Sequence, residues 1–117
     1  MRFGRITPTL AVTDMTVALR FYQDVLGFEK TFENGDPVSF VILKRDAAEF
    51  HLTTDPSHRA RIPNVAHLMV DDATGLHDHL VRHGVPIVKP LREEEYGLLD
   101  FVFADPDGNR IDVGQVI

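Results

Sequence analysis

The sequence predicts an α+β fold in which two βαβββ modules form a curved mixed sheet around a concave cleft. Two observations support this prediction. The order strand, helix, strand, strand, strand can be traced twice along the 117 residues. The residues that begin and end the two helices also recur at a nearly fixed interval, since Asp14 and Asp72 are 58 positions apart and Gly27 and Gly84 are 57 apart. Such a repeat indicates a duplicated supersecondary unit, so we expect one domain over 1–117 with tandem modules at about 1–57 and 58–117.

The first module follows from local signals in chain order. Residues 6–12 (ITPTLAV) are expected to form a strand, and Asp14 offers a helix N-cap. Apolar residues at helical spacing predict an amphipathic helix over 15–26. Gly27 stands where a left-handed residue commonly ends a helix. Strands are then predicted over 28–33, 38–43 and 48–53, with a tight-turn signal at 34–35.

The second module repeats this order. A strand is expected over 64–70, an N-cap at Asp71-Asp72, a helix over 73–83 and a cap at Gly84. Further strands are expected near 85–89, over 98–104 and over 110–116, with a turn at 105–109 (DPDGN). The segment 55–62, in which two prolines flank charged residues, is the expected joint between the modules.

Composition excludes several classes of protein. Eighteen acidic residues against 12 basic ones give a net charge of −6, whereas a nucleic-acid binder usually carries a basic patch. The chain has no apolar run long enough to span a bilayer and no secretory signal at its start. Cysteine is absent, which excludes disulfides and thiolate metal sites. We therefore expect a cytoplasmic protein with no nucleic-acid or membrane partner.

Strand alternation assigns candidate site residues to the bare faces of the two half-sheets. If the apolar residues of 48–53 face the helix, Glu49 and His51 face the cleft. The same reasoning places His67 and Asp112 on the cleft side of the second module. These residues have three possible roles. In the first, they are recognition groups that favour a cation. In the second, His51, His67 and Asp112 form a metal site of two histidines and one carboxylate in a shifted register. In the third, they are hydrogen-bonded residues that line a solvated groove.

Two aromatic residues extend this set. Phe40 could line the cleft and stack on an aromatic or cationic ligand, although alternation alone does not settle which face it takes. Tyr96 is a candidate lid or a packed residue. A pair of histidines at 79 and 83 has the helical spacing that can bind zinc, but we expect it to be a solvated surface pair.

Two segments carry a resemblance to a known family. Residues 14–28 (DMTVALRFYQDVLGF) and 105–111 (DPDGNRI) stand in the expected order around the repeated helix and glycine. With them the chain resembles, over essentially its whole length, the glyoxalase/bleomycin-resistance/extradiol-dioxygenase superfamily, also called the vicinal oxygen chelate fold. The resemblance implies that fold for this chain.

The resemblance also implies where metal ligands would stand. The enzymes of the superfamily present ligands from four equivalent strand positions, which fall here on Thr7, His51, Val65 and Asp112. Valine has no donor atom and an uncharged threonine hydroxyl is a poor ligand, while a catalytic metal usually needs three protein donors. We therefore expect no metal, no cofactor and no catalytic residue. Whether the chain is an enzyme stays open, with a metal-dependent lyase or dioxygenase as the alternative.

Residues 96–109 (YGLLDFVFADPDGN) resemble the bleomycin-resistance branch of the superfamily, with Tyr96 where that branch commonly has Trp. The resemblance implies antibiotic resistance by non-catalytic sequestration of a small organic ligand, cationic or aromatic. Because half-open sheets are often completed by a second chain, we also expect a homodimer. The candidate ligand-binding residues are Phe40, Glu49, His51, His67, Tyr96 and Asp112.

Overall fold

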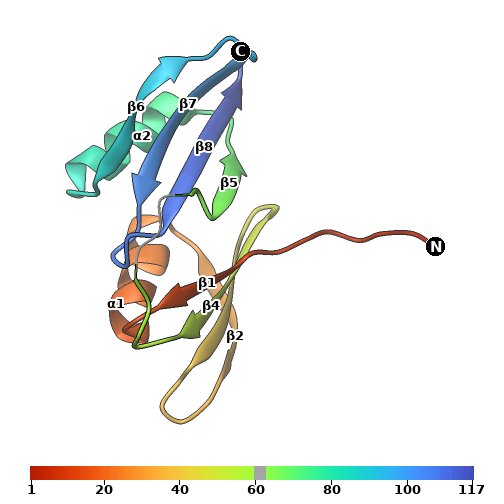
Figure 1. Cartoon of the computed structure of the whole chain (residues 1–117), viewed down its shortest axis with the longest axis vertical. Coiled ribbons are helices and arrows are strands. Elements are labelled where there is room, and N and C mark those ends of the chain that lie inside the picture. Colours follow the sequence, from red (N-terminus) through yellow and green to blue (C-terminus); the bar gives the residue numbers. More distant parts are fainter. Residues whose placement is uncertain (60–62) are drawn as a thin grey trace. The chain divides into compact units, whose positions relative to one another are not determined.

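Two four-stranded mixed sheets carry the fold, one in each of two units of the chain (Figure 1). The computed structural model describes residues 1–59 and 63–117, and the chain divides into Met1–His58 and Arg59–Ile117. The expected joint spans this division, and its last part, 60–62, lies outside the described residues. The two βαβββ modules are confirmed, whereas a single domain with a concave cleft stays a prediction. Over the described residues, no helix is long and apolar enough to cross a membrane.

The sheet of the first unit has the order β1-β4-β3-β2, with β1 parallel to β4 and the other pairs antiparallel. Its first strand begins later than the sequence suggested. Pro8 has no amide hydrogen for the ladder, and its carbonyl accepts a hydrogen bond from the His51 amide at 3.0 Å before regular pairing starts at Thr9. The strands are β1 (Thr9–Val12), β2 (Glu29–Asn34), β3 (Phe40–Arg45) and β4 (Ala48–Thr54).

The helix of the first unit is present but changes character along its length. Asp14 caps it as expected, because its Oδ1 accepts hydrogen bonds from the amides of Thr16 and Val17. The segment starts as α1 (Met15–Leu19) and continues as a π-helix, η1 (Arg20–Val25). A π-turn holds more residues per revolution than an α-turn, and the neighbouring Phe21 and Tyr22 are both buried there.

The second unit repeats the topology with the order β5-β8-β7-β6. Asp72 Oδ1 accepts from the Gly75 amide and caps the helix. Gly27 and Gly84 have φ of 73° and 71°, so both take the left-handed conformation expected at the helix ends. The elements are β5 (Ala66–Met69), α2 (Ala73–Arg82), β6 (Ile87–Glu93), β7 (Leu98–Ala104) and β8 (Arg110–Val116).

Each sheet buries one face under its own helix. In the first unit the ring of Tyr22 packs on Phe50 of β4 at 5.6 Å, and in the second His77 of α2 packs on Phe101 of β7 at 5.3 Å. Because strand side chains alternate, the residues between these buried positions project from the other side, which we call the open face of each sheet. The predicted ligand-binding residues of β3, β4, β5 and β8 lie on the open faces.

The segment 105–109 forms the predicted turn. Asp105 Oδ1 accepts hydrogen bonds from the amides of Asp107 and Asn109, and Oδ2 accepts from the Asn109 side chain. Asp105 and Asn109 are both buried. The carboxylate and amide therefore satisfy the backbone of the connection between β7 and β8.

Candidate ligand-binding site

Three rings cross the open face of the first sheet on three neighbouring strands. Phe40 of β3 lies 5.5 Å from the His51 ring of β4 and 6.3 Å from the Phe32 ring of β2, measured between centroids. We call Phe32, Phe40 and His51 the aromatic row. The structure thus settles the face of Phe40, which the sequence left open. Phe32, half exposed at 50%, was missed, because a register shift between Lys30 and Phe32 interrupts the simple alternation of β2.

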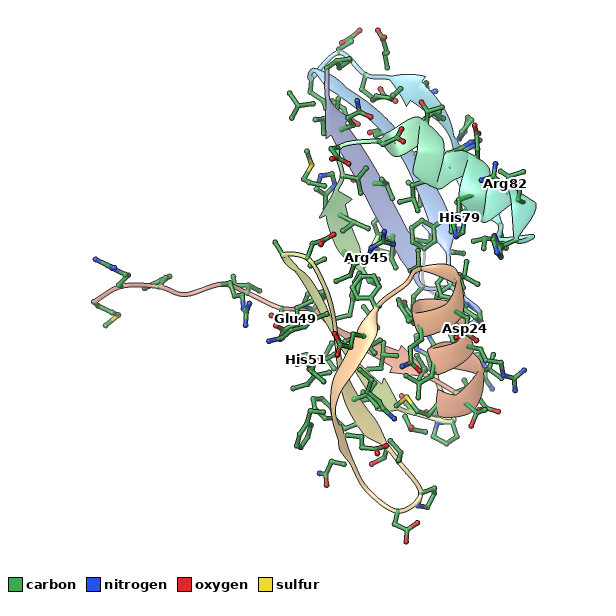
Figure 2. All side chains as sticks on the ribbon, turned by 180° about the vertical axis from the view of Figure 1, so that it is seen from behind. Asp24, Arg45, Glu49, His51, His79 and Arg82 are labelled. Atoms are coloured by element: carbon green, nitrogen blue, oxygen red, sulfur yellow. The ribbon has the colours of Figure 1, made fainter. Side chains whose placement is uncertain are left out.

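A carboxylate adjoins this row. The His51 Nε2 donates a hydrogen bond to Glu49 Oε2 at 2.7 Å, and a carboxylate can only accept, so Nε2 carries the proton. Figure 2 shows both side chains on the side of the sheet that faces away from the helix with Asp24. The other oxygen, Oε1, lies 3.0 Å from Arg5 and 3.6 Å from Lys44. Neither contact has hydrogen-bond geometry, and Oε1 is buried without a hydrogen bond.

The charge on Glu49 is well supported although the side chain is only 9% exposed. The hydrogen bond from His51 lowers the pKa of Glu49 most, and Arg5 and Lys44 lower it further, while burial acts in the opposite direction. The net pKa lies below its ordinary value, so Glu49 is an anion at neutral pH. The open face of the first sheet therefore combines rings with a fixed negative charge.

The open face of the second sheet carries a histidine held by a carboxylate. His67 Nδ1 donates to Asp112 Oδ2 at 2.7 Å, and the His67 Nε2 lies 2.9 Å from the Met69 sulfur. Gly114 leaves room for this ring, because a Cβ there would lie 3.1 Å from His67 Cε1. His67 and Asp112 are thus brought together as expected, and Gly114 is a supporting residue that the sequence did not reveal.

A second ionic cluster on this sheet surrounds a buried acid. Asp100 of β7 is 1% exposed, accepts a hydrogen bond from the Tyr96 hydroxyl and lies 3.4 Å from the Lys89 Nζ. Lys89 also pairs with Glu94 at 3.1 Å. Tyr96 itself is 63% exposed, so the ring stands free while its hydroxyl is anchored. Asp100 was overlooked, although a carboxylate inside the apolar run LLDFVFA was a visible signal.

The contacts in this cluster shift the titration of its members. The hydrogen bond to Asp100 raises the pKa of Tyr96 most, because only the protonated phenol can donate it, and the negative charge of Asp100 raises this pKa further. Glu94 and, to a lesser degree, Asp100 raise the pKa of Lys89. Arg92 and Lys89 lower the pKa of Glu94. The cluster is therefore arranged to keep Tyr96 neutral and Lys89 and Glu94 charged at neutral pH.

The donors at the four family positions do not fit a metal ion. Val65 offers no donor atom, Thr7 offers only a hydroxyl, and each unit contributes one good ligand, His51 or Asp112. Over the described residues, the chain gathers no group of three or more His, Asp or Glu side chains that could hold a metal. The ring of His79 on α2 lies 4.3 Å from that of His83, the residue that follows the helix, and His83 Nδ1 donates to the carbonyl of His79.

The fold defines a class of protein, the glyoxalase-like βαβββ domain. The family model for the Glyoxalase/Bleomycin resistance protein/Dioxygenase superfamily matches residues 2–113. The chain belongs to this superfamily.

Individual relatives agree with this assignment. A virulence protein of Salmonella typhimurium (strain LT2) is 28% identical over 116 residues, covering 92% of this chain and 81% of the relative. A superfamily member from Sphaerobacter thermophilus is 26% identical with a TM-score of 0.77, covering 97% of this chain and 98% of that one. A bleomycin-binding protein from Streptomyces verticillus, solved with copper(II)-bleomycin, is 25% identical with a TM-score of 0.79, covering 100% and 99%.

Proposed function

We propose that the protein binds a small organic ligand, aromatic and cationic, on its open sheet faces and sequesters it without chemical change. The observation that carries this proposal is the aromatic row beside the anionic Glu49. Rings offer stacking surface to a planar ligand, and a desolvated carboxylate selects a positive group. A protein that only holds its ligand needs no nucleophile and no metal.

Three further features support the proposal. The superfamily includes bleomycin resistance proteins, and the similar protein from Streptomyces verticillus is described as bleomycin-binding. The second open face adds the His67–Asp112 pair and an exposed Tyr96 ring held by its hydroxyl. We infer a bleomycin-like glycopeptide, or another aromatic cation, as the ligand class and antibiotic resistance in the cytoplasm as the role.

Titration calorimetry tests the proposal with metal-free bleomycin, copper(II)-bleomycin and a panel of aromatic cations. Phe40→Leu keeps an apolar side chain but removes the central ring of the row, so the affinity should fall about two- to tenfold, the value of one aromatic contact. Phe3→Leu is the matched control, because Phe3 is 89% exposed outside the sheet. If no probe binds, or if Phe40→Leu binds all of them like the parent, the proposal is wrong.

Two measurements address the remaining parts of the proposal. Elemental analysis of the purified protein distinguishes sequestration from the alternative, a metal-dependent lyase or dioxygenase. One tightly held transition metal per chain would favour the enzyme. Light scattering after gel filtration tests the homodimer, and a mass of one 13.2 kDa chain would contradict it.

A further inference from the structure

We propose that Arg5 pairs with the Glu49 carboxylate in place of the ligand. The ligand itself presents a guanidinium or amidinium group to the same carboxylate. This inference rests on the proposed function and names the chemistry of its cationic group. In the ligand-free protein, Arg5 of the N-terminal arm (residues 1–8) lies against the Glu49 carboxylate. On binding, the ligand displaces the Arg5 side chain.

The arm is loosely attached. It contains no helix or strand and leaves the first sheet as an extended segment (Figure 1). Phe3 and Ile6 are 89% and 95% exposed, and a Cβ built on Gly4 meets nothing within 4 Å. Over the described residues, the contacts found between arm and sheet are the Arg5–Glu49 ion pair and the hydrogen bond from His51 to the Pro8 carbonyl.

The two ends of the ion pair differ in their surroundings. The Arg5 side chain is 67% exposed, whereas the Glu49 side chain is 9% exposed. Exposed ion pairs contribute little to stability, because water and side-chain entropy offset the attraction. The carboxylate is thus a fixed feature of the sheet, while the guanidinium that meets it is readily exchanged.

The unsatisfied oxygen of Glu49 favours such an exchange. Oε1 lies 3.0 Å from Arg5 Nη2 but accepts no hydrogen bond. A buried acceptor without a donor is energetically costly. A free amidinium, not tethered to the arm, could align an N–H with Oε1, and charge-assisted bonds of this type are among the strongest. The neighbouring aromatic row would stack on the plane of the same group.

Benzamidine and its neutral analogue benzamide form the pair of probes. Calorimetric titrations would compare the parent with Arg5→Gln, Glu49→Gln and Arg2→Gln. Arg5→Gln should bind benzamidine about two- to fivefold more tightly, the effect of removing one exposed competing ion pair. Glu49→Gln should lose this binding, and benzamide should bind Arg5→Gln and the parent alike. Arg2→Gln removes the same charge from the same arm and should behave like the parent.

Nuclear magnetic resonance gives a second measurement. Saturating benzamidine should increase the fast mobility of the Gly4 amide in the parent, because the arm loses its ion pair, and should leave it unchanged in Glu49→Gln. If Arg5→Gln binds benzamidine no better than the parent, the inference is wrong even if bleomycin binds. If no variant binds benzamidine, the inference is also wrong, and the bleomycin titration then judges the proposed function by itself.

Discussion

The two units share one scaffold and differ on their open faces. Each has the same strand order, an aspartate N-cap and a left-handed glycine after the helix. The open face of the first sheet combines the aromatic row with one carboxylate, Glu49. The open face of the second sheet is ionic, with Asp100, Lys89 and the His67–Asp112 pair.

This difference separates residues that build the fold from residues free to serve function. The caps and the helix-facing core recur because each module must end its helix and bury one sheet face. The open faces carry no such requirement, so their side chains differ. We therefore expect the open faces, rather than the helices, to determine which ligand the protein binds.

The largest expected effect tests the shared scaffold. Tyr22 is fully buried in the first unit and Leu80 in the second. Tyr22→Ala should lower the free energy of unfolding by about 3–5 kcal/mol and Leu80→Ala by about 2–5 kcal/mol, because each leaves a cavity. Urea denaturation measures both, with the exposed Phe3→Ala as the control expected to stay within about 0.5 kcal/mol. A Tyr22→Ala cost below about 1 kcal/mol would contradict the packing described for the first unit.

A smaller effect separates the ionic contacts of the two units. Lys89 is the cation beside the buried Asp100, whereas Lys30 pairs with Glu33 on the surface at 3.2 Å. Lys89→Met should cost about 1–3 kcal/mol, because a buried carboxylate loses its partner. Lys30→Met should cost less than about 1 kcal/mol. If both substitutions lower the free energy of unfolding equally in urea denaturation, Asp100 depends on its lysine no more than the surface residue Glu33 does.

Much of the scaffold could be predicted from the sequence because its signals are local. An aspartate before an apolar run and a glycine after it mark helix ends through backbone hydrogen bonding and φ, both set within a few residues. The change from α1 to the π-helix η1 was not predictable in this way. It coincides with the burial of Phe21 and Tyr22 and with the packing of Tyr22 on Phe50, a contact distant in sequence.

The candidate site was less accessible to sequence reasoning. Alternation along a strand places His51 and Asp112 on a face, but pairing register decides which neighbours they meet. A register shift brought Phe32 into the aromatic row, and Arg5 reaches Glu49 from an arm without secondary structure. Such contacts depend on tertiary placement, whereas the carboxylate of Asp100 in an apolar strand was a local signal that could have been used.

The third prediction asks which open face recognises charge. Asp112→Asn should weaken bleomycin binding up to about tenfold, the loss of about 1.4 kcal/mol of charge attraction, and the remaining affinity should depend less on salt. His51→Ala should weaken binding and also lower the free energy of unfolding by about 1–3 kcal/mol, because the mostly buried Glu49 loses its hydrogen-bond donor. Calorimetry at low and high salt measures both. If Asp112→Asn keeps the parent's salt dependence, the ionic face does not select the cation.

The smallest expected effect is a shift in the titration of one tyrosine. The chain has two tyrosines, and Tyr22→Phe leaves Tyr96 as the sole phenol to follow by ultraviolet absorbance. Its pKa should lie above the ordinary 10.0, because its hydroxyl donates to Asp100. Asp100→Asn should return the pKa toward the ordinary value. A titration that Asp100→Asn leaves unchanged would contradict the hydrogen bond.

The same shift has a consequence for stability at alkaline pH. A folded-state pKa above the unfolded one means that the folded protein holds the phenol proton more tightly. The stabilisation that the Tyr96 phenol contributes is therefore fully present below its unfolded-state pKa. It is lost as pH rises through the raised pKa of the folded state. The pKa of Lys89 is raised as well, so its contribution disappears in the same direction. Tyr96→Phe should therefore remove part, but not all, of the alkaline loss in thermal melts, because the contribution of Lys89 remains.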